Sequence, residues 1–487
     1  MANQTIYNLA FDLGASSGRL MLSKLANGET VELTELHRFP NEPVMVNGTF
    51  MWDTVRLVHE MTTGLKAAAA LNLPIDGIGI DTWGVDYGFL DKDGNLIGVP
   101  INYRDARTDN SMSEVAAIMP LSEIYESTGI QFMALNTIFQ LHADKQMRPV
   151  IYENADKLLF MPDLLAYFLT GETVCEYTIA STSQLLGANT RTWDKAMMER
   201  LGLRTDMLLD IIQPGTVIGT LTKAMQDETG LGAVPVIAVG SHDTASAVAA
   251  TPFNGKENAE DNKGKDGNAI EAFLSCGTWS LLGVELDEPI ITAAAFESNF
   301  TNEGGVEGTI RFLKNINGLW VIQQLRKSWN ELNNVKIGYP EIAAAAKAAN
   351  QNFAIDPSDP VFLAPQNMVA TITRACEQAG QGTPQGIGEL AIAVYNGLTG
   401  EYKTHVDNLA RLAGRPIGTI HMIGGGIQDE FLCQMTAKAT GRTIQAGPVE
   451  GSVLGNILMQ WKARGRIASL AEGRSVIRRS FEQKIYG

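Results

Sequence analysis

Asp12-Leu13-Gly14-Ala15-Ser16-Ser17-Gly18-Arg19 is a run of small residues between two apolar segments, 6–13 and 20–25. The pattern predicts a strand, a tight turn and a second strand. Small side chains leave backbone N–H groups and two serine hydroxyls free to approach an anion, so we expect this hairpin to grip a phosphate. Asp12 is a candidate ligand of Mg²⁺, directly or through water, because hard cations prefer carboxylate oxygens. The alternative, from these residues alone, is an ordinary hairpin with a solvated Asp12.

The segments that follow predict an α/β unit. A third extended segment covers 32–39, and a helix is expected over about 53–71, with Asp53 as its cap. The short β-branched run 75–80 contains glycine and is typical of a buried parallel strand. Three strands, a helix and a returning strand are the opening of a ribonuclease-H-like α/β fold.

Length and charge narrow the class of protein. A chain of 487 residues is too long for one compact core, so we expect two domains. The formal net charge of −16 argues against a nucleic-acid or anionic-membrane surface. We find no signal-peptide pattern and no apolar run long enough to span a bilayer, and we therefore expect a cytoplasmic protein. Four scattered cysteines without a CxxC pair are expected to be reduced and buried: Cys175, Cys276, Cys376 and Cys433.

A candidate substrate wall follows the strand 75–80, in the stretch Asp81-Thr82-Trp83-Gly84-Val85-Asp86-Tyr87. The carboxyl ends of strands line the ligand crevice in open α/β sheets. A sugar can stack on Trp83 while its hydroxyls meet Thr82 or the backbone at Gly84. The alternative is that Trp83 belongs to the core and Asp81 is a structural cap.

A candidate general base lies where a second apolar strand, 236–239, gives way to Gly240-Ser241-His242-Asp243-Thr244-Ala245-Ser246-Ala247. The pattern places Asp243 on the first turn of a helix. A carboxylate there can accept the proton of a sugar hydroxyl as that hydroxyl attacks a γ-phosphate. Helix capping is the alternative, because Asp is a favoured N-cap residue. His242 has no ligand cluster around it, so metal binding by it is not expected.

The pattern of the first hairpin recurs later in the chain. Residues 272–283 again read as strand, small-residue turn and strand, with Cys276-Gly277-Thr278-Trp279-Ser280 as the turn. Two such turns about half a chain apart predict a duplicated fold that clamps phosphates between its halves. The stretch before it, 253–268, is charged, Gly- and Asn-rich and aperiodic, which is typical of a surface loop at a domain boundary. We therefore expect a sugar-binding domain over 1–252, a boundary loop over 253–270 and a nucleotide-binding domain over 271–487.

Other polar groups are compatible with more than one role. Arg104 and Arg107 either bind substrate oxygens or form structural ion pairs. The Ser/Thr-rich stretch 176–184 either approaches the crevice or lies on the surface. Asn315 and Gln323 are amides that can touch nucleotide or solvent. Three glycines at 424–426, between a strand and a helix, permit close approach of adenine or ribose, although neither a GxGxxG nor a GxxxxGK[ST] motif is present.

The order of four motifs resembles the FGGY carbohydrate kinases, members of the actin, hexokinase and Hsp70-like superfamily. The motifs are Asp12 to Arg19, Gly240-Ser241-His242-Asp243-Thr244, Ser275-Cys276-Gly277-Thr278-Trp279 and His421-Met422-Ile423-Gly424-Gly425-Gly426. The resemblance runs from the first hairpin to about Gln460 and implies two actin-like ATPase domains with a cleft between them. The chain departs from the pattern in the insert at 253–268 and in Tyr103, where many of these kinases carry Trp.

The resemblance also implies an activity: ATP-dependent transfer of phosphate to the 1-hydroxyl of L-rhamnulose, with Mg²⁺. It implies that Asp243 is the proton acceptor, that Asp12 positions Mg²⁺, and that the sugar contacts Gly84, His242, Asp243 and Thr244. The nucleotide-binding residues that it implies are Ala15, Ser16, Ser17, Gly18, Arg19, Thr278, Asn315, Gln323 and Gly425.

Two rival functions stay open at this point. One is a kinase of the same fold for another ketose, such as L-fuculose or a pentulose. The other is a nucleotide-switched protein of the actin-like type that transfers no phosphate; a base at Asp243 speaks against it, because a switch needs none. We expect a monomer or homodimer that takes a small ketose and ATP.

Overall fold

The structure, a computed structural model, describes residues 5–253, 269–350, 352–363 and 365–487. The chain divides into two compact units that interleave in sequence. Unit 1 comprises Met1–Pro252, Glu285–Phe312 and Gly451–Ser480, and unit 2 comprises Phe253–Val284, Leu313–Glu450 and Phe481–Gly487. The expected boundary loop falls for the most part on 254–268, outside the described residues, and the boundaries expected at 252 and 271 stay a prediction.

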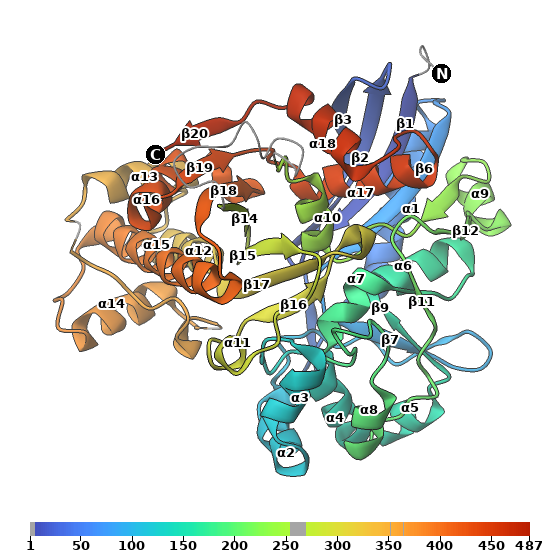
Figure 1. Ribbon diagram of the computed structural model, residues 1–487, viewed down its shortest axis with the longest axis horizontal. Helices are drawn as coiled ribbons and strands as arrows, with labels where there is room; N and C mark the ends of the chain where they lie inside the picture. The colour runs from blue at the N-terminus through green and yellow to red at the C-terminus, as the bar shows by residue number, and fades with distance from the viewer. Residues whose placement is uncertain (1–4, 254–268, 351, 364) are drawn as a thin grey trace. The chain divides into compact units, whose positions relative to one another are not determined.

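Unit 1 is built on a six-stranded mixed sheet in the order β12-β13-β6-β1-β2-β3. Its strands are β1 (Ile6–Leu13), β2 (Ser17–Ala26), β3 (Thr30–Pro40), β6 (Ile75–Thr82), β12 (Val217–Thr220) and β13 (Pro235–Ile237). The first three strands are antiparallel neighbours, and β6 runs parallel to both β1 and β13. The hairpin, the third strand and the returning parallel strand are confirmed, as Figure 1 shows in blue.

Helices cover both faces of this sheet. Isoleucines and glycines alternate along β6, so that each kind faces a different helix. Ile78 and Ile80 belong to a core that includes Met61 and Leu65 of α1 (Thr54–Ala69). The intervening Gly77 and Gly79 face the other way, where an added Cβ would meet Gln460 of α17 (Gly451–Ala463). Helix α1 begins after Asp53, whose side chain accepts a hydrogen bond from the Arg56 amide, so the expected cap is confirmed.

The rest of unit 1 is mainly helical, with short strands between the helices. The helices are α2 (Ser111–Ile118), α3 (Leu121–Thr128), α4 (Thr137–Met147), α5 (Pro149–Asn154), α6 (Met161–Thr170), α7 (Tyr177–Ala180), α8 (Lys195–Arg200), α9 (Lys223–Thr229), α10 (Asp243–Ala250), α11 (Ala293–Glu297) and α18 (Leu470–Ser480). The short strands are β4 (Val44–Val46), β5 (Thr49–Met51), β7 (Tyr87–Leu90), β8 (Leu96–Ile97), β9 (Lys157–Phe160), β10 (Cys175–Glu176), β11 (Ile211–Ile212) and β16 (Thr301–Gly304).

Unit 2 repeats the opening pattern of unit 1. Strand β14 (Ile270–Cys276) pairs antiparallel with β15 (Trp279–Leu286) and parallel with β18 (Ile417–Ile423), as β1 does with β2 and β6. Within unit 2 the strand order is β17-β15-β14-β18-β19-β20, with β17 (Ile310–Asn317), β19 (Thr443–Ala446) and β20 (Lys484–Tyr486). Only the part of β17 from Leu313 onward belongs to unit 2, because its first residues, up to Phe312, belong to unit 1. The helices are α12 (Trp320–Asn333), α13 (Tyr339–Ala348), α14 (Met368–Gln378), α15 (Gly386–Ala413) and α16 (Glu430–Thr440). The expected duplication of the hairpin is therefore confirmed.

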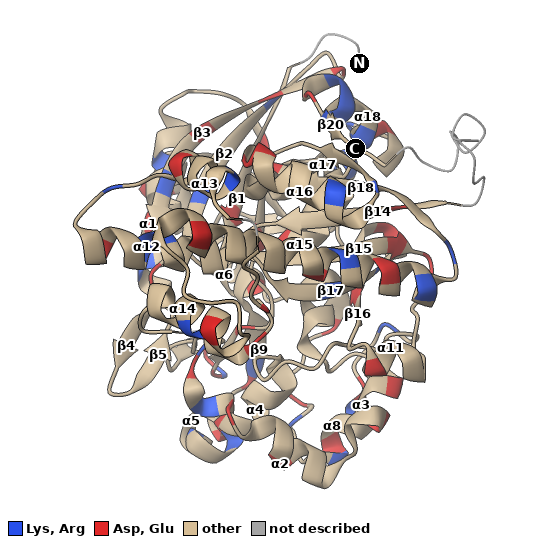
Figure 2. Ribbon diagram, turned by 90° about the vertical axis from the view of Figure 1, so that its left-hand side faces the viewer, with Lys and Arg blue, Asp and Glu red and all other residues tan. Residues whose placement is uncertain are grey.

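Charged residues of both signs occur together on the outer helices. Figure 2 shows them in blue and red, and α8 carries Lys195, Glu199 and Arg200 within six residues. The four cysteines are free and buried, as expected. In the part of the chain that the structure describes, no helix is long and apolar enough to cross a membrane.

Candidate active site

Asp12 ends up beside two charged partners because of strand register. It pairs across the hairpin with Arg19 and across the parallel ladder with Asp81. The Arg19 side chain donates to Asp12 Oδ2 through Nε at 3.0 Å and through a terminal nitrogen at 2.8 Å. Arg19, expected to hold phosphate, therefore also orients the carboxylate expected to hold Mg²⁺.

The turn between β1 and β2 has the form expected of a small-residue hairpin. The Gly14 amide donates to the Ser17 carbonyl at 2.9 Å, which closes the turn, and Ser16 at its tip is exposed. Gly18 is buried: a Cβ there would lie 2.3 Å from the ring of Phe39. Packing thus already requires glycine at position 18, whatever ligand the turn binds.

Asp81 is a buried carboxylate at the end of a polar chain between β1, β6 and α17. Its Oδ2 accepts a hydrogen bond from Asn456 at 2.7 Å, and Asn456 in turn accepts one from Gln460 at 2.8 Å. Burial raises the pKa of Asp81 well above its ordinary value, and the charges of Asp12 and Asp243 raise it further. The negative charges of these three carboxylates of unit 1 therefore interact.

Asp243 is the first residue of α10, as the sequence predicted, and it is not the N-cap, which is His242. The Thr244 hydroxyl donates to Asp243 Oδ1 at 2.9 Å, and His242 Nε2 lies 3.5 Å from the same oxygen. About a third of the side chain, 31%, is exposed. Desolvation raises the pKa of Asp243, whereas His242 and the Thr244 hydroxyl act to lower it. This is the setting of a carboxylate that can both ionise and take up a proton.

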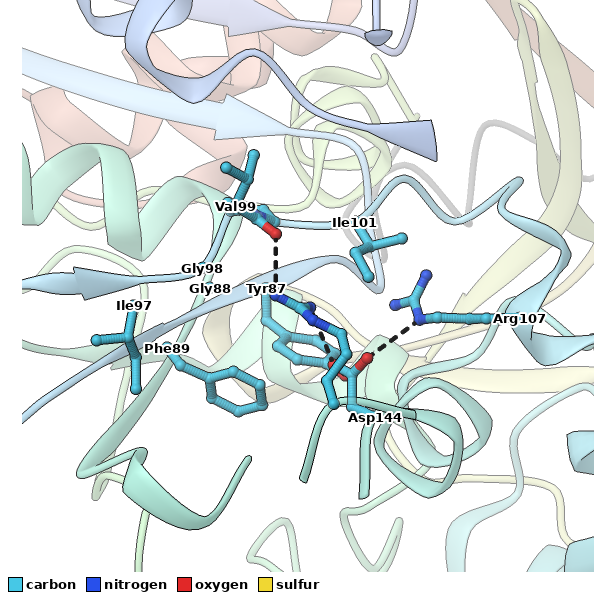
Figure 3. A pocket seen from close by; sticks show the side chains of 11 residues that line it. Tyr87, Gly88, Phe89, Ile97, Gly98, Val99, Ile101, Arg107 and Asp144 are labelled. Carbon is cyan, nitrogen blue, oxygen red and sulfur yellow. Dashed lines mark hydrogen bonds and ion pairs between the residues drawn. The ribbon is translucent and has the colours of Figure 1, made fainter. Parts of the chain in front are cut away.

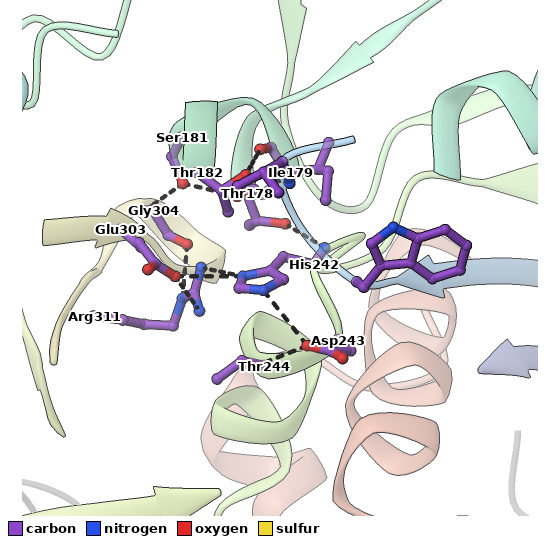
Figure 4. A network of polar contacts seen from close by, with 12 residues as sticks. Thr178, Ile179, Ser181, Thr182, His242, Asp243, Thr244, Glu303, Gly304 and Arg311 are labelled. Atoms are coloured by element: carbon purple, nitrogen blue, oxygen red, sulfur yellow. Dashed lines mark hydrogen bonds and ion pairs between the residues drawn. The ribbon is translucent and has the colours of Figure 1, made fainter. Parts of the chain in front are cut away.

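His242 lies between Asp243 and a buried ion pair that the sequence did not reveal. Figure 4 shows its ring with Asp243 on one side and Glu303 and Arg311 on the other. An Arg311 terminal nitrogen is 3.1 Å from His242 Nδ1, and Glu303 Oε2 is 3.4 Å from the same atom. Arg311 has no exposed surface, and 4% of Glu303 is exposed.

The backbone before Asp243 is held by α7. Glu176 caps that helix, accepting from the Thr178 and Ile179 amides, and its Oε2 lies 3.3 Å from the Ser241 amide. The His242 amide donates to the Thr178 hydroxyl at 3.2 Å. Burial raises the pKa of Glu176 to about 7. The stretch 176–184 was expected either to approach the site or to lie on the surface, and these contacts favour the first alternative.

Gly84 faces His242 directly. A Cβ on Gly84 would lie 3.3 Å from His242 Nε2 and 3.3 Å from Thr182, so glycine keeps this wall open. Trp83, by contrast, is only 5% exposed and packs on Trp52 at 4.0 Å between ring centroids. Its indole N–H donates to the buried Asp86 at 3.0 Å. The core interpretation of Trp83 fits better than the sugar-stacking one.

The arginine cluster around Arg107 is a structural ion pair (Figure 3). Arg107 Nε lies 3.3 Å from Asp144 Oδ1, and both side chains are almost fully buried. The Tyr87 hydroxyl donates to Asp144 Oδ2 at 2.9 Å. These groups line a small pocket together with Phe89 and Arg148, and the buried ion pair favours the structural role of Arg107.

The remaining nucleotide-binding candidates gather in unit 2. Thr278 lies in the turn between β14 and β15, and its carbonyl accepts the Trp320 amide at 3.1 Å. Gly424 to Gly426 pack on that same hairpin: a Cβ on Gly426 would lie 2.4 Å from Cys276 Sγ. Asn315 lies on β17 and Gln323 on α12, each partly buried. These candidates therefore belong to unit 2, whereas Asp12, Asp81 and Asp243 belong to unit 1.

Two family models match this chain. The FGGY family of carbohydrate kinases, N-terminal domain, matches residues 7–250, and its C-terminal domain matches residues 272–464. The chain belongs to the FGGY family of carbohydrate kinases, and the predicted family and actin-like α/β fold are confirmed.

Relatives agree with this assignment, and solved structures have a similar fold. The chain is 43% identical to a rhamnulokinase of Bacteroides thetaiotaomicron, over 98% of this chain and 95% of that protein. It is 41% identical to a rhamnulokinase of Enterococcus faecalis, over 98% and 93%. Its fold is similar to gluconate kinase from Lactobacillus acidophilus (TM-score 0.78, 17% identity, 99% and 94% covered) and to Plasmodium falciparum glycerol kinase with ADP (TM-score 0.76, 15% identity, 99% and 94% covered).

Proposed function

We propose that the protein is an ATP-dependent kinase that transfers the γ-phosphate to the 1-hydroxyl of L-rhamnulose, giving L-rhamnulose 1-phosphate. The observation that carries this is the identity of about 40% with several rhamnulokinases over nearly the whole chain. The geometry of unit 1 supports it, because Asp243 has a partly exposed carboxylate with one oxygen already hydrogen-bonded. We also expect a cytoplasmic monomer or homodimer with small-molecule substrates and no nucleic-acid or membrane partner.

In the proposed reaction, Asp243 accepts the proton of the sugar hydroxyl as that oxygen forms a bond to the γ-phosphorus. The bond between the γ-phosphorus and the bridging oxygen breaks, and ADP leaves with the electron pair. Gly84 and His242 to Thr244 form the sugar side of the site. Ala15 to Arg19, Thr278, Asn315, Gln323 and Gly425 contact the nucleotide.

Asp12 is the residue that would hold Mg²⁺. Its carboxylate is 13% exposed and lies next to Asp81 in the sheet. No group of three or more His, Cys, Asp or Glu side chains suited to a metal occurs among the described residues. One carboxylate nevertheless fits Mg²⁺, which keeps several waters and is commonly bound by one or two carboxylates together with substrate phosphates. When bound, Mg²⁺ neutralises charge that develops on the phosphates.

The test is coupled ADP release with Mg-ATP and L-rhamnulose, with L-fuculose, L-ribulose and D-xylulose in parallel. A rate on L-rhamnulose far above the others is the expected result. A higher rate on another ketose would keep the kinase and change the substrate. ADP release that does not depend on sugar would overturn the kinase and favour a nucleotide switch.

A further inference from the structure

The buried Arg311 guanidinium makes three contacts, each with a different group of unit 1. Nε donates to the Gly304 carbonyl at 2.9 Å, one terminal nitrogen lies 3.1 Å from Glu303 Oε2, and the other lies 3.1 Å from His242 Nδ1. A fully buried arginine is unusual and needs both charge balance and hydrogen bonds. Arg311 has both, and one of its contacts is with the neighbour of the proposed base.

The contact with His242 fixes where the imidazole carries its proton. Every guanidinium nitrogen is a donor and none is an acceptor. His242 Nδ1 must therefore accept from Arg311, and the ring proton is on Nε2. That nitrogen faces Asp243 Oδ1 at 3.5 Å. The other tautomer would turn an N–H of His242 toward an N–H of Arg311.

The Thr244 hydroxyl and the His242 ring both contact the same oxygen of Asp243. Oδ1 accepts a hydrogen bond from the Thr244 hydroxyl and lies 3.5 Å from His242 Nε2, whereas Oδ2 accepts no hydrogen bond from a side chain of the described residues. A carboxylate fixed through one oxygen presents the other in a defined direction. Oδ2 is then the atom that accepts the substrate proton.

We propose that Arg311 and Glu303 are positioning residues: together they hold His242 in the Nε2–H tautomer, and His242 orients Asp243 so that Oδ2 faces the sugar hydroxyl. The proposal rests on the proposed function of Asp243. It concerns contacts within unit 1 alone. It assigns a role to β16 and β17, from which no residue of the sugar side was predicted.

Charge balance explains why Glu303 is needed together with Arg311. Burial lowers the pKa of Arg311, and the negative charges of Glu303, Asp243 and Glu176 oppose that shift. Glu303 supplies the close counter-charge at 3.1 Å. Without it, the guanidinium would be drawn toward Asp243, and the contact with His242 Nδ1 would weaken.

The first test observes the tautomer directly and needs no activity. In protein labelled with ¹⁵N-histidine, the chemical shifts of the six histidines report which ring nitrogen carries hydrogen, and the His242→Gln variant assigns the signal. We expect Nδ1 without hydrogen in the wild type and a mixture of tautomers in Arg311→Lys, because an ammonium cannot span the same three partners. A wild-type His242 with hydrogen on Nδ1 would overturn the proposal.

The second test separates positioning from a merely structural role. Arg311→Lys and Glu303→Gln should lower kcat by about 10²-fold with little change in the KM for sugar or ATP, because a misaligned base slows chemistry without removing ground-state contacts. In a His242→Ala background, Arg311→Lys should have little further effect on kcat. If Arg311→Lys lowers kcat by the same factor in the His242→Ala background as in the wild type, the proposal is overturned.

The matched control is Arg107→Lys. Arg107 is also buried in unit 1 and paired with a carboxylate, Asp144, and it has no contact with His242. This variant should lose thermal stability to a similar extent while kcat and the His242 signal stay as in the wild type. A wild type inactive on every ketose would refute the proposed function, whereas an active wild type whose kcat survives Arg311→Lys would refute the positioning role alone.

Discussion

Replacing Gly455 with alanine tests how α10, the helix that begins at Asp243, is held in place. Gly455 lies on α17, and a Cβ there would lie 1.7 Å from the carbonyl oxygen of Ser246 on α10. This contact would have to lengthen to about 3.5 Å, and the obstacle is backbone, which cannot rotate away. Overpacking by a methyl group destabilises by up to about 3 kcal/mol, and alanine returns about 1 kcal/mol of helix propensity. We expect a net loss of about 2 kcal/mol in the free energy of unfolding.

The measurement is urea unfolding followed by the fluorescence of the seven tryptophans, one of which, Trp461, is buried in α17 itself. Gly400→Ala is the control, because Gly400 also lies within a helix, α15, and an added Cβ there meets no atom within 4 Å. That variant should be more stable than the wild type by about 0.5–1 kcal/mol. Gly455→Ala should also lower kcat, since α10 carries the proposed base. A Gly455→Ala protein as stable and active as the wild type would refute the reasoning.

Three further predictions concern the site and the thiols. Asp243→Asn should lower kcat by about 10² to 10⁴ while the KM for ATP stays close to that of the wild type; unchanged turnover would contradict its role as base. Burial raises the pKa of Glu176 from 4.5 to about 7 in the folded protein, so the folded state binds this proton more tightly than the unfolded state does. The resulting stabilisation is complete below pH 4.5 and is lost as the pH rises through about 7. The melting temperature should therefore fall less between pH 5 and 8 in Glu176→Gln than in the wild type. An equal fall in both proteins would contradict this role of Glu176. A thiol reagent should modify none of the four buried cysteines in the native protein and all four in denaturant, and fast native labelling would contradict their burial.

The sequence allowed prediction of the parts of the site that depend on local pattern. The hairpin around Gly14, its copy around Gly277 and the helix that begins at Asp243 each occupy a few consecutive residues with a strong turn or strand signal. Their position along the chain was therefore predictable from residue types alone. Strand β13 was predicted to reach Val239 and ends at Ile237. Further along the chain the backbone contacts β6 again, where the Thr82 amide donates a hydrogen bond to the Ser241 carbonyl.

The partners of His242 could not be predicted, for a physical reason. Arg311 is 69 residues away in the chain, and nothing about an arginine in an apolar strand says which imidazole it meets. Glu303 is followed by Gly304 and Gly305, and nothing in that local pattern indicates an ion pair with an arginine. Trp83 shows the opposite difficulty: an aromatic residue beside a strand end suits a sugar or a core equally, and only the contacts with Trp52 and Asp86 distinguish the two.

The three separate segments of unit 1 have a consequence for synthesis on the ribosome. Gln460 and Asn456 donate hydrogen bonds into β1 and β6, to the Leu9 carbonyl and to Asp81, across more than 370 residues of chain. The first sheet therefore emerges early but lacks its covering helix α17 until almost all of the polypeptide has been made. Nascent chains that stop before residue 451 should expose polar and apolar surface of β1 and β6 and be bound by chaperones or degraded. A chain that reaches Ser480 is the first that contains every segment of unit 1.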